Sequence, residues 1–405
     1  MAQSHWPRRI AGSVAGLIAA AALMALPSAL RAQGPVAQQV AAAKKPVTAQ
    51  QMADYHRKLA AYKAVRDKFD AEAEAYWTAI ADKRRTRNAK RRNNDAIAAP
   101  DYVLTQPPLY TGPPRPVDPS EPEKPTKPRR AIPVAEDFLK HAAEQFHFVP
   151  RRPRTEIEFK QAYARVAQTA GLTRDQAVRV YSFEAGGNGK YDVQAGLESA
   201  RPNARAISTA LGYNQLLTTN TVELLAEQGH GILKALESAA ARMQGSQRTA
   251  MEHKIAIVRK MVAFCKSVPD QWSAHEKLGV TPQGIGIHAL NLDVDVGPWL
   301  QTHKLLTSVD FAKRKGYTAR LTAAELEMMN LTGDGTGFDM VSMPQALRMV
   351  VPTSNFFQRT GYERNPVAIR NNTVAKLLAA TDARMDREST MPGARDMAAA
   401  FSNQN

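Results

Sequence analysis

The chain has 405 residues, a formal net charge of +16 and a single cysteine, Cys265. One cysteine excludes an internal disulfide framework, and its position excludes a lipid-anchoring cysteine at the end of an export signal. Cys265 lies on the apolar side of a helical pattern, "IVRKMVAFCKSV", which indicates a small buried hydrophobe and not a nucleophile.

The first 32 residues have the pattern of an export signal. The cationic start "MAQSHWPRR" precedes the apolar run "IAGSVAGLIAAAALMALPSAL", and small residues follow. We expect cleavage after Ala32 and a periplasmic protein. Leu30, three residues before that cut, is larger than usual, which leaves an uncleaved membrane anchor open. No later segment approaches the roughly 18 apolar residues that span a bilayer, so we expect a soluble mature chain.

Residues 33–98 form a basic segment that is helical from about 50 to 95. Its apolar residues recur at spacings of three and four, at Leu59, Tyr62, Val65, Phe69, Ala73 and Tyr76. One helix cannot bury such a stripe alone, so it docks on the folded part or pairs with a partner helix. The run "KRRTRNAKRR", residues 83–92, would suggest nucleic acid in a cytosolic protein. After export we expect no nucleic acid, and contact with an anionic envelope surface or a solvated helix end remain alternatives.

The remaining chain divides by composition into three parts. Residues 99–135 are rich in proline and predict a semi-rigid extended linker. Residues 136–390 predict one folded domain, and residues 391–405 a flexible tail. In the domain, helical patterns cover 155–169, 218–243, 247–266 and 373–388, and capping boxes occur at Thr173/Gln176 and Thr322/Glu325. The segment 284–297, "GIGIHALNLDVDVG", is the one serious strand candidate, so we predict a mainly α domain with at most a small hairpin.

Glu184 is the candidate catalytic residue. If a helix begins near Arg174, the glycines at 186, 187 and 189 end it, and Glu184 occupies its last turn. The carbonyl ends of that turn make the local field negative, and the neighbouring rings lower the dielectric, so both effects favour a protonated carboxyl. A carboxylic acid that keeps its proton near neutral pH is what cleavage of a glycosidic bond requires, because the leaving oxygen must be protonated.

Two further motifs accompany Glu184. In "ISTALGYNQLL", Gly212 marks a close approach of the backbone, followed by Tyr213, Asn214 and Gln215. Together with Glu184, this pattern resembles the lysozyme-like lytic transglycosylases, the superfamily that includes soluble lytic transglycosylases and goose-type lysozymes. In that family a Glu-Ser dipeptide ends a helix and a later Gly-Leu-Met-Gln turn shapes the sugar groove. A third family segment, Ala-Tyr-Asn-Ala-Gly-like, corresponds to "EMMNLTGDGTG", with Met329, Asn330 and Gly333 in the matching places.

The chain departs from the family pattern in three respects. Ala185 replaces the serine after the glutamate, Tyr213 and Asn214 replace Leu-Met, and the gap from Glu184 to Gly212 is longer than is common. These differences indicate a divergent member. They leave the details of the substrate open.

The resemblance implies a lysozyme-like catalytic domain that acts on peptidoglycan glycan strands. It implies cleavage of the bond between N-acetylmuramic acid and N-acetylglucosamine without water, by Glu184 as acid and then base, to give a 1,6-anhydro sugar. No cofactor or metal is implied. Gln215 and Asn330 match family positions and are candidate substrate-binding residues. Tyr213 and Asn214 of the same turn are further candidates, and Tyr362, in "SNFFQRTGYERNP", is a candidate ring for stacking on a sugar.

Two alternatives remain open from the sequence. If Asp192, eight residues after Glu184, positions a water molecule, the enzyme is a hydrolytic muramidase. If activity has been lost, which the missing serine after Glu184 would favour, the chain is a peptidoglycan-binding or envelope-assembly scaffold. A calcium loop over 330–341 is disfavoured, because Val341 occupies the position of the bidentate glutamate. The histidines contain no HExxH pair, so a zinc peptidase is unsupported.

Overall fold

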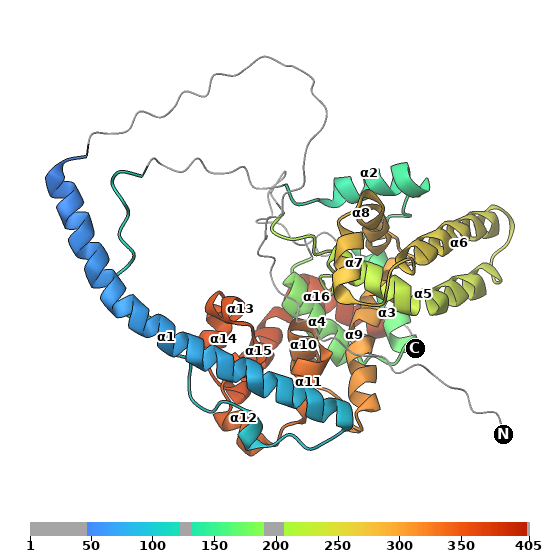
Figure 1. Ribbon diagram of the computed structural model, residues 1–405. Coiled ribbons are helices and arrows are strands. Elements are labelled where there is room, and N and C mark those ends of the chain that lie inside the picture. Colours follow the sequence, from blue (N-terminus) through green and yellow to red (C-terminus); the bar gives the residue numbers. More distant parts are fainter. Residues whose placement is uncertain (1–46, 122–130, 190–205, 403–405) are drawn as a thin grey trace, which may run out of the picture.

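The computed structural model describes residues 47–121, 131–189 and 206–402, and within these ranges the chain is built of helices without a β-strand (Figure 1). The prediction of a mainly α fold is therefore confirmed. In chain order, the first ten α-helices of the described residues are α1 (Ala49–Asn93), α2 (Ala135–Phe146), α3 (Glu156–Thr169), α4 (Arg174–Ala185), α5 (Thr218–Ala240), α6 (Gly245–Cys265), α7 (Trp272–Gly279), α8 (Pro282–His288), α9 (Gly297–Arg314) and α10 (Ala323–Thr332). They are followed by α11 (Asp334–Ser342), α12 (Gln345–Val350), α13 (Arg359–Glu363), α14 (Pro366–Arg370), α15 (Val374–Glu388) and α16 (Pro392–Ser402).

The helix starts follow the capping signals of the sequence. Thr173 and Gln176 form the predicted capping box of α4, with the Thr173 Oγ1 accepting from the Gln176 backbone at 3.1 Å. Thr322 and Glu325 form the corresponding box of α10, at 3.2 Å. Side-chain oxygens at these positions satisfy backbone N–H groups that have no partner within the helix, which fixes where each helix begins.

The hairpin expected over 284–297 is wrong. The segment forms α8 and a 3₁₀ turn, η2 (Ala289–Leu292). Thr281 caps α8 and Pro282 occupies its first position. Gly286 brings α8 onto α2, since a Cβ there would lie 2.8 Å from the His141 carbonyl. The alternating glycines that suggested a strand in this segment thus allow close packing between helices.

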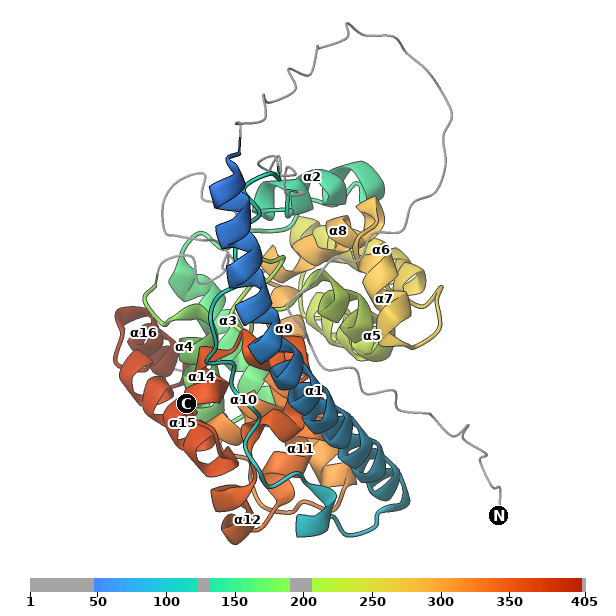
Figure 2. The same cartoon turned by 60° about the vertical axis from the view of Figure 1, so that its left-hand side comes forward.

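The helices pack as two groups joined by α9. One group contains α2, α5, α6, α7 and α8, and the other contains α4, α10, α11 and α15 (Figures 1 and 2). Helix α9 contacts α5 on one side and α10 and α11 on the other. Most buried apolar side chains belong to one core, which includes Cys265, whose thiol pKa burial raises to about 12. A smaller core around Met340 and Phe356 lies beneath the end of α1.

Helix α1 docks on the domain through its C-terminal half. The Tyr76 hydroxyl lies 2.6 Å from the Ser354 hydroxyl, and the Trp77 ring centre lies 5.6 Å from that of Tyr362. The N-terminal half extends away from the other helices (Figure 1). The sequence predicted that the helix either docks on the folded part or pairs with a partner helix. The first outcome is observed for the C-terminal half of α1.

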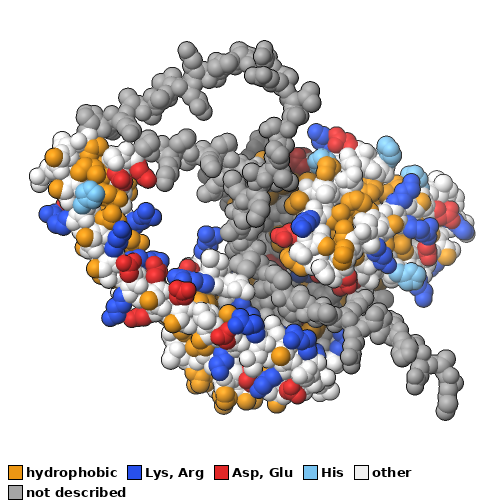
Figure 3. Space-filling view, viewed as in Figure 1, with side chains coloured by type: hydrophobic (Ala, Val, Ile, Leu, Met, Phe, Trp, Pro, Cys, Tyr) orange, Lys and Arg blue, Asp and Glu red, His pale blue; other side chains and the backbone are white. Residues whose placement is uncertain are grey.

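Most of the basic run 83–92 is engaged within the protein. Lys83 donates to the Pro100 carbonyl and Arg84 to the Phe357 carbonyl, at 2.6 and 2.7 Å. Lys90 pairs with Asp101 at 2.7 Å. Basic and acidic side chains alternate along the outer surface of α1 (Figure 3). The charges of this run serve mainly to dock α1 and the segment after it.

The proline-rich segment is extended, as predicted, but its described first part is held in place. Beyond a 3₁₀ turn, η1 (Ala99–Asp101), it runs back along α1. The Val103 backbone donates to Asn355 at 3.0 Å, and the Tyr110 ring packs on Phe69 with centres 5.2 Å apart. The Arg66 guanidinium lies 5.0 Å from both ring centres. This segment covers apolar residues of α1 that the domain does not reach, so it is more than a free spacer.

The chain end differs from the flexible tail expected for 391–405. Residues 392–402 form α16, which packs on α3 and α4. Ala394, Met397 and Phe401 are buried, and Gln168 donates to the Phe401 carbonyl at 3.0 Å. Apolar residues three and four apart produce this packing face. The predicted signal peptide lies outside the described residues, and no helix within them is long and apolar enough to cross a bilayer.

Candidate active site

Glu184 lies in the last turn of α4, as predicted. Gly186 follows in the left-handed conformation, with φ of 75°, and ends the helix. The Arg384 guanidinium of α15 donates to the Phe183 carbonyl at 3.0 Å and lies 4.2 Å from the centre of the Phe183 ring. No local pattern of the sequence indicates that a cation from α15 offsets the negative end of α4.

Asn330 of α10 binds the Glu184 carboxyl. Its Nδ2 donates to Glu184 Oε1 at 2.9 Å, across 146 positions of sequence. The fold thus brings together two of the residues selected from separate motifs. The Asn330 Oδ1 is buried and has no hydrogen-bond partner among the described residues.

Glu327 is a second carboxyl at this position, and the sequence analysis missed it. It lies on α10 three residues before Asn330, so both side chains share one face of the helix. Its side chain is fully buried, and among the described residues no hydroxyl or cationic donor reaches its carboxyl oxygens, while the Asn330 amide lowers its pKa against the larger effect of burial. It lies within hydrogen-bonding reach of Glu184, which requires a proton between the two carboxyls. Burial raises the pKa of both groups, and the neighbouring Glu184 raises that of Glu327 further.

Lys304 of α9 is a cation whose charge acts on both of these acids. It lowers the pKa of Glu184 and Glu327, which burial raises, and it acts in the same direction on Asp334 and Glu223. Asp334 accepts a hydrogen bond from Ser308 at 2.5 Å. Helices α4, α5, α10 and α11 therefore contribute acidic groups around one lysine of α9, where the two helix groups meet.

Burial raises the pKa of Glu223 on α5 to about 7, and the carboxyls of Glu227, Asp270 and Asp334 add to this while Lys304 opposes it. The folded protein therefore keeps a proton that the unfolded chain releases at its ordinary pKa of 4.5. Stability should fall as pH rises from 4.5 to 7, and the loss should be complete above pH 7.

We predict that Glu223→Gln removes this loss. The variant should be about 1–3 kcal/mol more stable than the wild type at pH 8 and equal to it at pH 4. Urea unfolding at pH 4, 6 and 8 measures the difference. A constant difference across that range would show that Glu223 titrates normally.

The turn containing Gly212 and Gln215 is tight and largely internal. A Cβ on Gly212 would lie 2.3 Å from the Gln301 amide, which explains the glycine. Asn214 is fully buried, and its Nδ2 donates to the Gln301 carbonyl at 2.7 Å. Gln215, at φ of 44°, donates to the Gly212 carbonyl at 2.7 Å. The Asn214 side chain thus holds the loop against α9, and the Gln215 side chain closes the turn on itself.

Two rings predicted to contact sugar are instead core residues. Tyr213 is fully buried, packs edge-on against Tyr163 and Tyr181, and donates its hydroxyl to Glu156 at 2.9 Å. Tyr362 is 3% exposed beneath Trp77 of α1. Aromatic rings that face packed helices have no free face for a sugar, so the prediction that Tyr213 and Tyr362 bind substrate is wrong. The same prediction for Asn214 is wrong because its side chain is fully buried. Asp192 lies outside the described residues.

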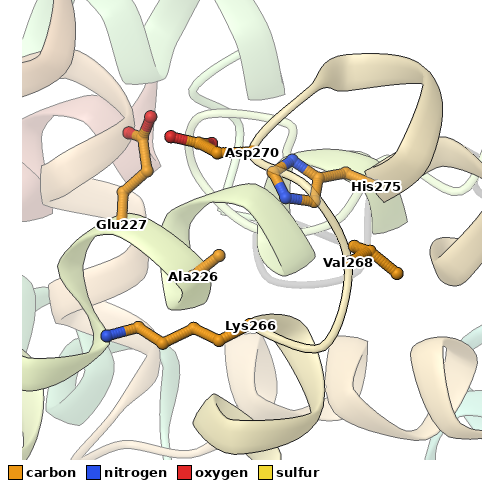
Figure 4. A pocket seen from close by; sticks show the side chains of 6 residues that line it. All are labelled: Ala226, Glu227, Lys266, Val268, Asp270 and His275. Carbon is orange, nitrogen blue, oxygen red and sulfur yellow. The ribbon is translucent and has the colours of Figure 1, made fainter. Parts of the chain in front are cut away.

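A cavity of about 390 Å³ opens beside α5, at the connection from α6 to α7. The carboxyls of Glu227 and Asp270 point toward one another across it, and the Lys266 side chain extends away from them (Figure 4). His275 is buried, and its ring nitrogens have no hydrogen-bond partner among the described residues. Burial lowers its pKa, so the imidazole is neutral. No group of three or more His, Cys, Asp and Glu residues in the described part of the chain is placed to hold a metal ion.

Comparison with known proteins identifies no relative. No family model matches the chain, and no curated protein or solved structure shows significant similarity to it. The fold and the site therefore define a mainly α protein with two adjacent carboxyls, one of them fully buried.

Proposed function

We propose that the chain is a peptidoglycan lytic transglycosylase that acts in the periplasm. The observation that carries this proposal is the environment of Glu184: a partly buried carboxyl at a helix end, bound by Asn330 and adjacent to the buried Glu327. Burial raises its pKa, as a general acid near neutral pH requires. The resemblance of the three sequence motifs supplies the substrate class.

In the proposed reaction Glu184 acts twice. It first donates its proton to the glycosidic oxygen between N-acetylmuramic acid and N-acetylglucosamine. The resulting carboxylate then accepts a proton from the muramoyl C6 hydroxyl as that oxygen bonds to C1. Because one residue is used as acid and then as base, no carboxylate on the opposite side of the sugar is needed to hold a water molecule.

Glu327 does not fill the place of such an opposing carboxylate. It is fully buried and hydrogen-bonds directly with Glu184, so it leaves no room for an attacking water between them. Glu327 therefore gives no support to the hydrolytic alternative.

The products distinguish the alternatives. Purified full-length protein is incubated with peptidoglycan sacculi, and the released muropeptides are weighed by mass spectrometry. We expect anhydro ends, lighter by one water than reducing ends. Reducing ends would indicate a muramidase, and binding without release over a range of pH would indicate a scaffold.

The dependence on pH follows from the direction of the Glu184 shift. The acid must be protonated in the starting complex, so the rate should be highest below its pKa and should fall as pH rises through it. Because burial raises that pKa, the fall should occur above the ordinary value of 4.5 for glutamate. Initial rates of release between pH 4 and pH 9 test this, and a fall centred near 4.5 would contradict it.

A further inference from the structure

Glu327 is an acid with no counter-charge in contact. Its side chain has no exposed surface, and no hydroxyl or cationic donor of the described residues reaches its oxygens. Asn330 and Lys304 favour its anionic form less than burial opposes it. A carboxylate in such a place loses its hydration and gains less in return, whereas the neutral acid can be buried at far lower cost. The side chain is therefore protonated at neutral pH, and its O–H needs an acceptor.

The acceptor is the carboxyl of Glu184. Because Glu327 and Asn330 share one face of α10, both reach the end of α4. The Asn330 amide occupies Glu184 Oε1 at 2.9 Å. Two donors from one helix thus converge on one carboxyl, and the hydrogen bond from Glu327 lowers the pKa of Glu184 against the larger effect of burial.

We infer that Glu327 is a positioning residue that stays protonated throughout and donates a hydrogen bond to the Glu184 carboxylate formed during the reaction. This role rests on the proposed function. As the glycosidic C–O bond breaks, its electron pair stays on the leaving oxygen, which takes the Glu184 proton. As the C6 oxygen bonds to C1, the C6 hydroxyl proton returns to Glu184. Between these events the hydrogen bonds from Asn330 and Glu327 hold the anion in place.

The charged groups of the surrounding helices are consistent with this assignment. Lys304 of α9 and Arg384 of α15 favour the anionic form of Glu184. Asp334 of α11 accepts from Ser308, and burial raises its pKa. Among these groups Glu184 is partly exposed while Glu327 is fully buried, so Glu184 is the one that ionises.

The test compares Glu327→Gln with Glu327→Leu. Glutamine is a neutral donor of the same shape as the protonated acid, whereas leucine cannot donate. The full-length protein is labelled with ¹³C at the glutamate carboxyls, and the Glu184 signal is assigned by its absence in Glu184→Gln. Titration by NMR should give a Glu184 pKa in the glutamine variant within a few tenths of the wild type, and about one unit higher in the leucine variant.

Activity provides the second measurement. The rate of anhydromuropeptide release near neutral pH should be retained in the glutamine variant and should fall about tenfold or more in the leucine variant.

Two titration results would overturn the inference. A Glu184 pKa that drops by a unit or more in Glu327→Gln would mean that Glu327 is ionised in the wild type. An unchanged pKa in Glu327→Leu would mean that the two carboxyls do not interact. The titration does not depend on glycan cleavage, so the expected titration without release of muropeptides would reject the proposed function and keep the carboxyl pair.

Discussion

Replacing Glu184 with glutamine should lower the rate of anhydromuropeptide release by about 10²- to 10⁴-fold, the usual contribution of a general acid. Glutamine has the shape of the protonated acid and can still accept the bond from Asn330, but it has no proton of suitable acidity to give. The release rate from sacculi measures the effect. The thermal unfolding midpoint should stay close to that of the wild type, because the substitution removes only a titratable proton.

The matched control is Asp310→Asn on α9. It makes the same change from acid to amide at an exposed position outside the candidate site, and it should leave the rate unchanged. An equal loss in both variants would point to a general effect of charge on binding to the wall. Full activity in Glu184→Gln would remove Glu184 from the chemistry and reopen the search for the acid.

The position of Glu184 in the last turn of its helix could be predicted from the sequence, because helix-capping residues close to it determine where the helix begins and ends. A capping box at Thr173 starts the helix and a left-handed glycine at 186 ends it, which leaves Glu184 in the last turn. The meeting of Glu184 with Asn330 depends on tertiary packing of α4 on α10, which no local pattern in the sequence determines.

Glu327 could have been suspected from the sequence. In "ELEMMNL" it is an acid among apolar neighbours, on the same helical face as Asn330. Such a pattern does not say whether the acid faces solvent or the core, because the direction of a helix face is decided by its neighbours. Tyr213 was misassigned for the same reason: a ring beside a glycine turn packs equally well on a sugar or on other rings.

The N-terminal segment is joined to the site through α11. Arg87 and Arg91 of α1 both bind Asp339, with Arg87 Nε at 3.1 Å, and all three side chains are buried. The other Arg87 nitrogens donate to the carbonyls of Asp101 and Asn355, each at 2.9 Å. Helix α11 packs closely on α10, since a Cβ on Gly337 would lie 2.4 Å from Met329 Cα. The docking of α1 therefore bears on the helix that carries Glu327 and Asn330.

Replacing Asp339 with alanine should destabilise the protein by about 3–5 kcal/mol, because it leaves two arginines buried without their anion. Urea unfolding of the full chain measures this change. Hydrogen exchange should show lost protection in residues 76–93 of α1 and, to a smaller extent, in α10 and α11. The loss of stability is large because Arg87, Arg91 and Asp339 are all buried away from water.

An ion pair at the start of the same helix is the control. Asp54 pairs with Lys58 at 2.7 Å on the exposed end of α1, where solvent screens the charges, so Asp54→Ala should not measurably change the unfolding midpoint. If Asp339→Ala released α1 while α10 and α11 kept full protection, α1 would be an accessory arm whose docking is independent of the site. Loss of protection in all three helices together would show that α1, though far from Glu184 in sequence, is part of the framework that holds the carboxyl pair.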